Sequence, residues 1–263
     1  MKEVLVESQG LAESYHAALL ALYNQGEIIS CNDWEQNQQE VSMTMVVNEP
    51  LAEPMISKLY IGGFRELQQY QMEVLDGILD FKIGEETTWE YTYHDRMVNF
   101  PTSDGKNVNQ IEFVINELKR NSDSRRAIIN IRDNGIDPFN ENPACLQSLQ
   151  YFIRGGKLHC KVMMRSNDAT KATFMNAFAF IMMQKKIADE LGVSVGTYTH
   201  RANSFHCYEK DFPLLKQYVD GINAGDLDNI TYEYEDFYQD MMEETIPEIE
   251  ELVSTLKQES EQR

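Results

Sequence analysis

Apolar residues along the chain recur at two spacings, one typical of helices and one typical of strands. Apolar positions three and four apart predict an amphipathic helix over residues 8–24, with Ser8 as its cap and Gly26 as its stop. Partial alternation and β-branched residues predict strands at 27–31 and 41–47, separated by the polar loop "NDWEQNQQE". A chain that mixes the two spacings in this way is predicted to be an α/β protein.

The next part of the chain favours helices. Residues 53–76 have a helical pattern that Gly62-Gly63 interrupts. Residues 109–120 place their apolar side chains on one face, with Asn109 as a cap, and "RRAIINIR" then predicts a strand at 125–132. This order of elements predicts helices that pack against a sheet.

The stretch "LQSLQYFIRGGKLHCKVMM" predicts a β-hairpin, because both residues of its Gly155-Gly156 turn accept positive φ. Cys160 lies on the apolar face of the second strand, so we expect it to be a small core residue. Residues 174–191 are apolar nearly all round in their first half and end at Gly192, which predicts a central buried helix.

The last part of the chain predicts an extended segment over 195–208 and a helix that Pro213 opens. From about residue 233 the chain becomes an acidic, helical tail. The sequence has no internal repeat and no low-complexity linker. We therefore predict one mixed α/β (α+β) domain over 1–263, with a central sheet packed by helices around the long buried helix.

Composition narrows the class of protein. Lys and Arg number 23 against 43 Asp and Glu, a net charge of -20, which argues against nucleic-acid binding. No apolar run is long enough for a membrane span or signal peptide, and the four cysteines show no paired spacing. We therefore expect a cytoplasmic protein with reduced thiols and no membrane partner. No cysteine or histidine spacing predicts a metal site, and no glycine-rich phosphate loop occurs.

Cys145 is the candidate nucleophile. It follows "NPA" at a loop-to-strand junction, and the predicted hairpin returns Arg165 to the same level. A guanidinium nearby would favour the thiolate, which is the form that attacks electrophiles. The alternative is that Cys145 is a buried packing residue, as most unpaired cysteines are.

The few basic residues predict an anion site. None occurs between Lys2 and Lys58, whereas "KRNSDSRR" and "RGGKLHCKVMMRSND" are rich in them. Arginine forks and a serine hydroxyl are suited to a phosphate monoester, which the guanidinium binds bidentately. The alternative for each arginine is a solvated surface ion pair. The candidates are Arg125, Arg126, Arg165 and Ser166.

Six segments stand in order over roughly residues 90–210. They are "YTYHDR", "DSRRA", "PACLQ", "GKLHCKVMMRSNDATKATFMNAF", "IADELGVSVGTYTH" and "SFHCYEKD". Together they resemble the thymidylate synthase superfamily, which includes the pyrimidine nucleotide hydroxymethylases. The archaeal-type thymidylate synthases are the most similar in motif.

The resemblance implies transfer of a one-carbon unit from 5,10-methylenetetrahydrofolate, or a related tetrahydropterin, to C5 of a pyrimidine nucleotide. Cys145 would add to C6 of the base. Arg165 and Ser166 would bind the 5'-phosphate, joined across the interface of a sheet-to-sheet homodimer by Arg125 and Arg126. The other implied roles are orientation of the folate by Asp168, contact with the sugar by His206 and Tyr208, acid/base catalysis by Glu66, and a water network that includes Tyr93.

Asn176 would read the base. Its amide donates to O4 and accepts from N3–H, which suits uracil, whereas an aspartate at this position of the superfamily suits cytosine. On an otherwise apolar helix, a polar side chain without a partner would cost about 1–3 kcal/mol. We therefore expect dUMP as the substrate and dTMP as the product.

Departures from the family pattern leave two alternatives. The region "SCNDWEQNQQE" has no cation where the family has an arginine, and an acidic tail replaces the short apolar C-terminus that closes over folate. A less closed site would let water replace hydride in the last step, giving a hydroxymethylase that acts on dUMP, dCMP or CMP. The bare loop and acidic tail also allow a catalytically silent interaction protein.

Overall fold

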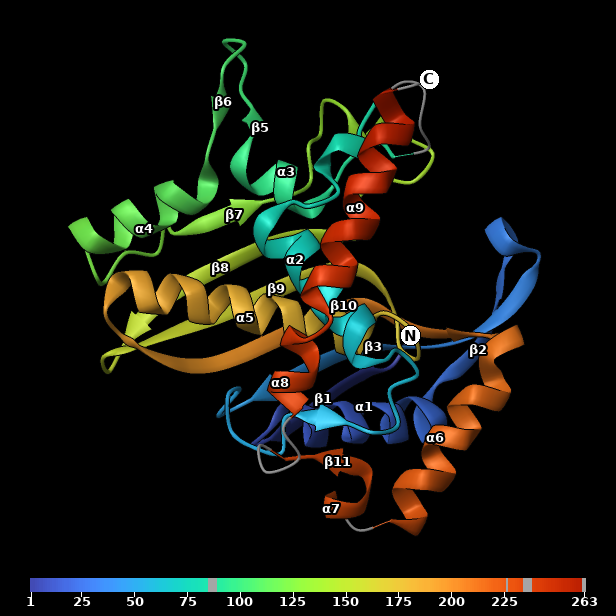
Figure 1. Cartoon of the computed structure of the whole chain (residues 1–263). Helices are drawn as coiled ribbons and strands as arrows, with labels where there is room; N and C mark the ends of the chain where they lie inside the picture. Colours follow the sequence, from blue (N-terminus) through green and yellow to red (C-terminus); the bar gives the residue numbers. More distant parts are fainter. Residues whose placement is uncertain (85–88, 226, 234–237, 262–263) are drawn as a thin grey trace.

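The structure, a computed structural model, describes residues 1–84, 89–225, 227–233 and 238–261. Its centre is a mixed sheet in the order β1-β3-β10-β9-β8-β7, with β2 also paired to β3 (Figure 1). The β1/β3 and β10/β9 pairs are parallel and the others are antiparallel. The strands of this sheet are β1 (Glu3–Ser8), β2 (Glu27–Cys31), β3 (Gln36–Val47), β7 (Ile128–Asn130), β8 (Leu146–Arg154), β9 (Lys157–Asp168) and β10 (Ser194–Tyr208).

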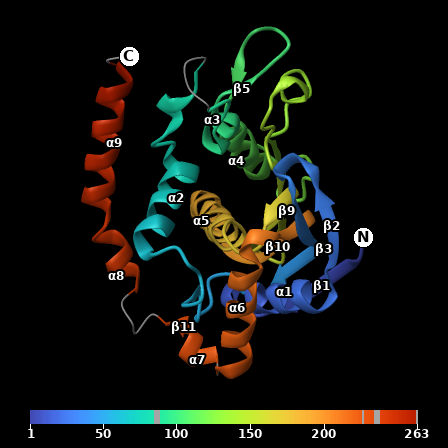
Figure 2. The same cartoon turned by 90° about the vertical axis from the view of Figure 1, so that its right-hand side faces the viewer.

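The helices lie in layers on one side of the sheet. Figure 2 shows α5 against the strands, α2 outside α5, and α9 outside α2. The α-helices are α1 (Leu11–Gln25), α2 (Phe64–Asp76), α3 (Tyr93–Val98), α4 (Gln110–Arg120), α5 (Thr173–Leu191), α6 (Phe212–Ala224), α7 (Leu227–Ile230), α8 (Tyr238–Glu243) and α9 (Ile246–Glu261). The remaining elements are short strands and 3-10 turns, namely η1 (Asn32–Trp34), β4 (Ile56–Ser57), η2 (Asp80–Lys82), β5 (Phe100–Pro101), β6 (Asn107–Val108), η3 (Asp137–Phe139), η4 (Glu209–Asp211) and β11 (Thr231–Tyr232).

The core lies between the sheet and α5, as the sequence predicts. Alternate residues of β9 from Leu158 to Met164, Cys160 among them, are at most 2% exposed and pack under α5. Gly192 ends α5 in the left-handed conformation, with φ of +66°. The predicted architecture, a mixed sheet packed by helices around a long buried helix, is therefore confirmed.

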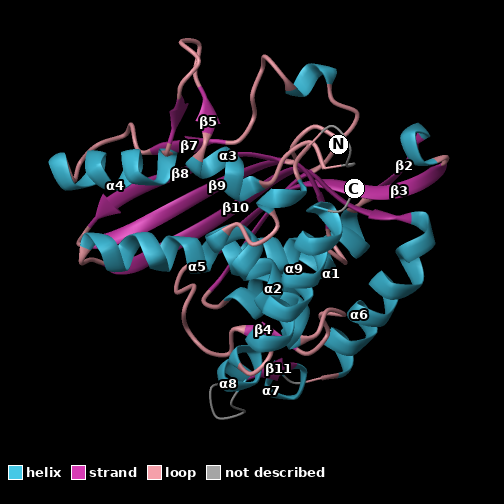
Figure 3. Cartoon of the chain, turned by 45° about the horizontal axis from the view of Figure 1, so that its top comes forward, coloured by secondary structure: helices cyan, strands magenta, loops and turns pink. Residues whose placement is uncertain are grey.

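Two sequence predictions near the N-terminus are wrong in their boundaries. Gly10, not Ser8, is the N-cap of α1. The polar residues 36–40, predicted as loop, belong to β3, because they pair antiparallel with β2 and residues 38–40 also pair with β10, at the end of the sheet where β2 and β3 project (Figure 3). A polar sequence forms a strand here because its backbone hydrogen bonds, rather than a buried face, hold it in place.

Two other predicted boundaries are also wrong. Residues 53–63 form turns and the short strand β4, so the helix begins only after its N-cap Gly63. The strand predicted over 125–132 extends only from Ile128 to Asn130. Asn109 does cap α4, where its side chain accepts a hydrogen bond from the Glu112 amide.

The β8/β9 hairpin sets the geometry of the candidate site. Gly155 and Gly156 have φ of +59° and +76°, as the predicted two-residue turn requires. A bulge at Gln147 shifts the register near the far end, so that Leu146 pairs with Met164. Beyond it the Arg165 amide donates to the Cys145 carbonyl at 2.8 Å. The predicted juxtaposition of Cys145 and Arg165 is thus confirmed.

The acidic tail is helical, as predicted, in the part of it that the structure describes. Ile249 and Val253 of α9 form a small apolar cluster with Leu79. Arg65 of α2 pairs with Glu248 of α9 at 3.1 Å. In the described ranges, no helix combines the length and apolar character needed to span a membrane.

Candidate active site

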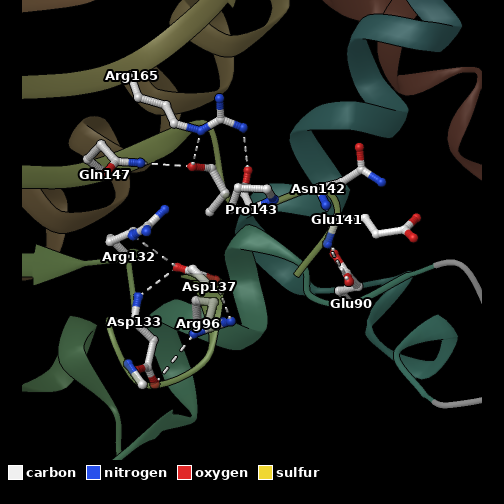
Figure 4. Close-up of polar contacts among 12 residues, drawn as sticks. Glu90, Arg96, Arg132, Asp133, Asp137, Glu141, Asn142, Pro143, Gln147 and Arg165 are labelled. Carbon is white, nitrogen blue, oxygen red and sulfur yellow. Dashed lines mark hydrogen bonds and ion pairs between the residues drawn. The ribbon is translucent and has the colours of Figure 1, made fainter. Parts of the chain in front are cut away.

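The loop that ends at Cys145 is held by Arg165 (Figure 4). The guanidinium donates from Nε to the Ala144 carbonyl at 3.1 Å and from Nη2 to the Pro143 carbonyl at 2.6 Å. Gln147, the bulged residue, donates its side-chain amide to the same Ala144 carbonyl at 2.8 Å. These bonds fix the backbone on the N-terminal side of the thiol.

A buried ion-pair cluster anchors the earlier part of the same loop (Figure 4). Arg96 of α3 donates to the buried carboxylate of Asp137 at 3.1 Å, and Arg132 approaches the same carboxylate at 3.8 Å. Glu90 accepts from the backbone amides of Glu141 and Asn142 at 3.3 and 3.2 Å. The loop is therefore attached at both ends, which gives Cys145 a defined position.

Cys145 is half-buried, and burial raises the pKa of its thiol above the ordinary value. Arg165 lowers that pKa, but its effect is the smaller of the two. The expected effect of Arg165, to favour the thiolate, is therefore present, but desolvation of the charged form outweighs it. Next to it, the Leu146 amide donates to the Tyr93 hydroxyl at 3.3 Å.

An aromatic pocket of about 310 Å³ lies beside this loop. Burial raises the pKa of the Tyr91 hydroxyl to about 12, and both the Cys145 thiol and Arg165 also act on it, which places this hydroxyl near both groups. The pocket is lined by Tyr70, Glu73, Val74, Leu79, Trp89, Glu90, Tyr91, Thr92, Tyr93 and Asn142.

Glu73 is the acid that sequence reasoning missed. Burial raises the pKa of its carboxyl group above the ordinary value, in a pocket where four side chains are aromatic. Glu66, the predicted acid/base, lies in the first turn of α2, where its exposed carboxylate accepts from the Gly63 amide at 2.9 Å. Glu66 and Glu73 are seven residues apart and therefore lie on the same face of α2. The helical periodicity of the sequence identifies this face, but it does not tell which turn of the helix lies at the pocket.

Asn176 lies on α5 and is 5% exposed. Its side chain is not left without a partner, because the Tyr70 hydroxyl of α2 donates to its Oδ1. Tyr70 lines the aromatic pocket, so the contact joins the predicted base reader to that pocket.

His206 and Tyr208 lie together at the end of β10, with ring centroids 4.7 Å apart. Burial lowers the pKa of His206, although nearby Asp168 raises it, so the ring is expected to be neutral at pH 7. Its Nε2 is buried and has no hydrogen-bond partner among the described residues. A buried nitrogen in this state fits a hydroxyl of a bound molecule.

Asp168 and Ser166 lie at the end of β9, adjacent to β10. Ser166 is opposite Ser204 and Asp168 is opposite His206 in the parallel register. Asp168 Oδ1 accepts from the amides of Thr170 and Lys171 at 2.9 and 3.0 Å, so this carboxylate also caps the turn before α5.

Arg125 and Arg126 are exposed and lie elsewhere in the chain. The Gln150 side chain donates to the Arg125 carbonyl at 3.1 Å, which places the pair beside the middle of β8, away from Cys145. Five strand residues separate the two levels, on the order of 15 Å. Within one chain, the structure does not bring these arginines to the other candidates.

Residues 62–224 match the family model described as thymidylate synthase. The chain belongs to the thymidylate synthase family. It is 30% identical over 222 residues to the protein named "Putative thymidylate synthase" of Methanocaldococcus jannaschii, over 81% of this chain and 95% of that one. A thymidylate synthase of Bacillus subtilis subsp. natto is 31% identical over 113 residues, which cover 43% of this chain and 40% of that protein.

A solved structure supports the fold of this family member. Thermostable thymidylate synthase A from Bacillus subtilis superposes with a TM-score of 0.66 at 18% sequence identity, covering 81% of this chain and 84% of that one. The predicted family and fold class are thereby confirmed, and the chain is a transferase of the thymidylate synthase type.

Proposed function

We propose that this protein is a thymidylate synthase that converts dUMP to dTMP through a covalent bond between Cys145 and C6 of the base. The observation that carries this proposal is the position of Cys145: the loop before the thiol is fixed by Arg165, and an aromatic pocket lined by the half-buried acid Glu73 lies beside it. Membership of the family supports the reaction class.

In this mechanism Cys145 loses its proton when the nucleotide binds and attacks C6, which makes C5 nucleophilic. Because burial keeps the thiol protonated in the free protein, a base is needed to take that proton. We assign proton transfer to Glu73, since its carboxyl group lines the pocket beside the loop of Cys145 and burial raises its pKa. The Tyr93 hydroxyl, which accepts from the Leu146 amide, holds the strand start beside the thiol.

The aromatic pocket suits methylenetetrahydrofolate. Flat side chains of Trp89, Tyr91 and Tyr93 would stack on a bicyclic pterin, and Glu90 and Asn142 offer polar groups at the rim. This group would supply the one-carbon unit and, in the methylating reaction, the hydride. Asp168 is the residue that we propose to orient it.

The nucleotide would lie along the strand ends. Arg165 uses Nε and Nη2 for backbone carbonyls, and in the described ranges its Nη1 has no hydrogen-bond partner, so this nitrogen is available for the 5'-phosphate beside Ser166. His206, with its unpaired Nε2, and Tyr208 would take the sugar hydroxyl. Asn176 would pair with O4 and N3–H of uracil.

We also propose a homodimer that joins the two sheets, in which Arg125 and Arg126 of one subunit reach the phosphate of the other. The exposure of Arg125 and Arg126 and their distance from Cys145 in one chain support this proposal.

We further propose that the chain forms one domain over residues 1–263, which the packing of α8 and α9 on α2 supports. The four free thiols suit a cytoplasmic location.

Incubation with 5-fluoro-deoxyuridylate and methylenetetrahydrofolate tests the proposal, because fluorine at C5 blocks completion of the reaction. We expect intact mass to show a ternary adduct that peptide mapping places on Cys145. Cys145→Ser should form no adduct and lose turnover by about 10⁴-fold or more, while it still binds dUMP. Folded wild-type protein that forms no adduct would overturn the mechanism.

A second candidate is a pyrimidine nucleotide hydroxymethylase, and the position of the C-terminal helix favours it. Figure 2 shows α9 outside α2. Ile249 and Val253 of α9 pack on Leu79, and no described residue of α9 is among those that line the aromatic pocket. Water would then reach the C5 methylene more easily than in a closed site. Mass spectrometry of the product distinguishes a methyl group from a hydroxymethyl group.

A further inference from the structure

The contact between Tyr70 and Asn176 has a fixed polarity. The Tyr70 hydroxyl oxygen lies at hydrogen-bond distance from Oδ1 of the Asn176 amide, which is an oxygen that has no proton to give. Tyr70 must therefore be the donor. The interaction holds the oxygen of the amide toward α2 and the nitrogen away from it.

No other group competes for this hydroxyl proton in the described part of the chain. Glu73 is one turn further along α2, where its carboxylate accepts from the Gln69 side chain at 2.9 Å, and the hydroxyl of Tyr70 donates to Asn176 instead. Burial raises the pKa of Tyr70 well above its ordinary value, so the hydroxyl stays protonated throughout the neutral range. Tyr70 thus remains a donor to the amide.

The orientation of an asparagine amide determines which pyrimidine it can pair with. Uracil offers an acceptor at O4 and a donor at N3, whereas cytosine offers a donor at N4 and an acceptor at N3. An amide that rotates freely by 180° can pair with either base. One that is held in a single orientation pairs with one base and leaves unsatisfied groups against the other. Asn176 has Tyr70 as its one hydrogen-bond partner among the described side chains.

We propose that Tyr70 is a positioning residue that fixes the amide of Asn176 and thereby makes the site select uracil over cytosine. This inference rests on the proposed function, in which Asn176 reads the base. The donated hydrogen bond makes rotation of the amide costly. After rotation the Tyr70 oxygen would accept from the amide N–H group, and the hydroxyl proton would be left without an acceptor among the described residues.

Tyr70→Phe tests the inference because it removes only the hydroxyl. Calorimetry gives the dissociation constants of dUMP and dCMP for the wild type and the variant. We expect the preference for dUMP, expressed as the ratio of the two constants, to fall about tenfold, mostly through tighter binding of dCMP. Tyr60→Phe is the matched control, since its hydroxyl contacts the sulfur of Met175, next to Asn176, at 3.6 Å. The ratio of the two dissociation constants in Tyr60→Phe should equal that of the wild type.

Asn176→Asp supplies the readout that a merely structural role would not change. The two oxygens of a carboxylate are equivalent after rotation, so Tyr70 has no orientation to select. The double variant Asn176→Asp/Tyr70→Phe should therefore have the same ratio of dUMP and dCMP dissociation constants as Asn176→Asp alone. A tenfold change in this background would overturn the inference.

The possible failures are distinguishable. A wild-type protein that binds neither nucleotide would overturn the proposed function and the inference with it. A wild type that prefers dUMP, together with an unchanged ratio in Tyr70→Phe or an equal loss in Tyr60→Phe, would overturn only the role of Tyr70. If circular dichroism shows that Tyr70→Phe is unfolded, Tyr70→Leu removes the same hydroxyl and replaces it in the test.

Discussion

The candidate site has two walls that are built in different ways. In the strand wall, Cys145, Arg165 and His206 are placed by backbone pairing of β8, β9 and β10. In the helical wall, Tyr70 and Glu73 are placed by the packing of α2 against its neighbours. Pairing register fixes a strand residue relative to another strand, whereas a helix can shift along its axis by whole turns and keep its apolar face buried.

The two walls act on the Cys145 thiol in opposite directions. Burial raises its pKa on the side where Tyr91 and Tyr93 lie near the thiol, whereas Arg165 of the strand wall lowers it. Burial has the larger effect. A cation beside a cysteine therefore does not by itself bring the pKa of the thiol below its ordinary value when the same loop lies against aromatic side chains.

The largest effect should come from the acid of the helical wall. We expect Glu73→Gln to lower kcat by about 10²–10⁴-fold, because it removes a group that exchanges a proton inside the pocket. Glu66→Gln is the matched control, on the same face of the same helix but two turns away, and should change kcat by no more than about twofold. Steady-state kinetics with dUMP and methylenetetrahydrofolate measures both. The opposite order of effects would assign the acid/base role to Glu66 instead.

A smaller effect is expected from the strand wall. Arg165→Ala should raise the KM for dUMP by about 10–100-fold, since hydrogen bonds to a charged group are lost and the loop before Cys145 loses two contacts. Arg154→Ala is the control, because that guanidinium also donates to backbone carbonyls but lies at the turn end of the same hairpin. Equal changes in KM for the two variants would contradict a phosphate site at Arg165.

The smallest effect concerns the balance between the walls at the thiol. The raised pKa means that Cys145 keeps its proton to higher pH than an ordinary thiol, whose pKa is about 8.5. The rate of Cys145 alkylation by iodoacetamide should therefore rise by about tenfold per pH unit up to a higher pH in the folded protein than in urea. In the unfolded protein in urea, the rate for the same peptide should level off at a lower pH. Mass spectrometry of the Cys145 peptide measures the rate. Arg165→Ala should move the midpoint further up; a rate already constant near pH 7 would mean that the cation dominates.

The sequence predicted the strand wall closely because its signals are local. A glycine pair fixed the turn, alternation fixed the faces, and counting from the turn placed Arg165 near Cys145. The bulge at Gln147, which brings the two backbones into register, has no comparable signal in a single sequence. The strand formed by the polar residues 36–40 was missed for a related reason, since the backbones of β2 and β10, and not an apolar pattern of its own, hold it in place.

By itself, the sequence determined the family, the buried α5, the hairpin and the identity of the nucleophile and arginine candidates, because each depends on residue type and spacing along one strand or helix. Only the tertiary structure decided that Glu73, not Glu66, lies in the pocket, that Tyr70 partners Asn176, and that burial outweighs Arg165 at the thiol. These three results depend on which turn of α2 meets α5 and on how much water is excluded. Neither quantity is encoded in any single segment of the chain.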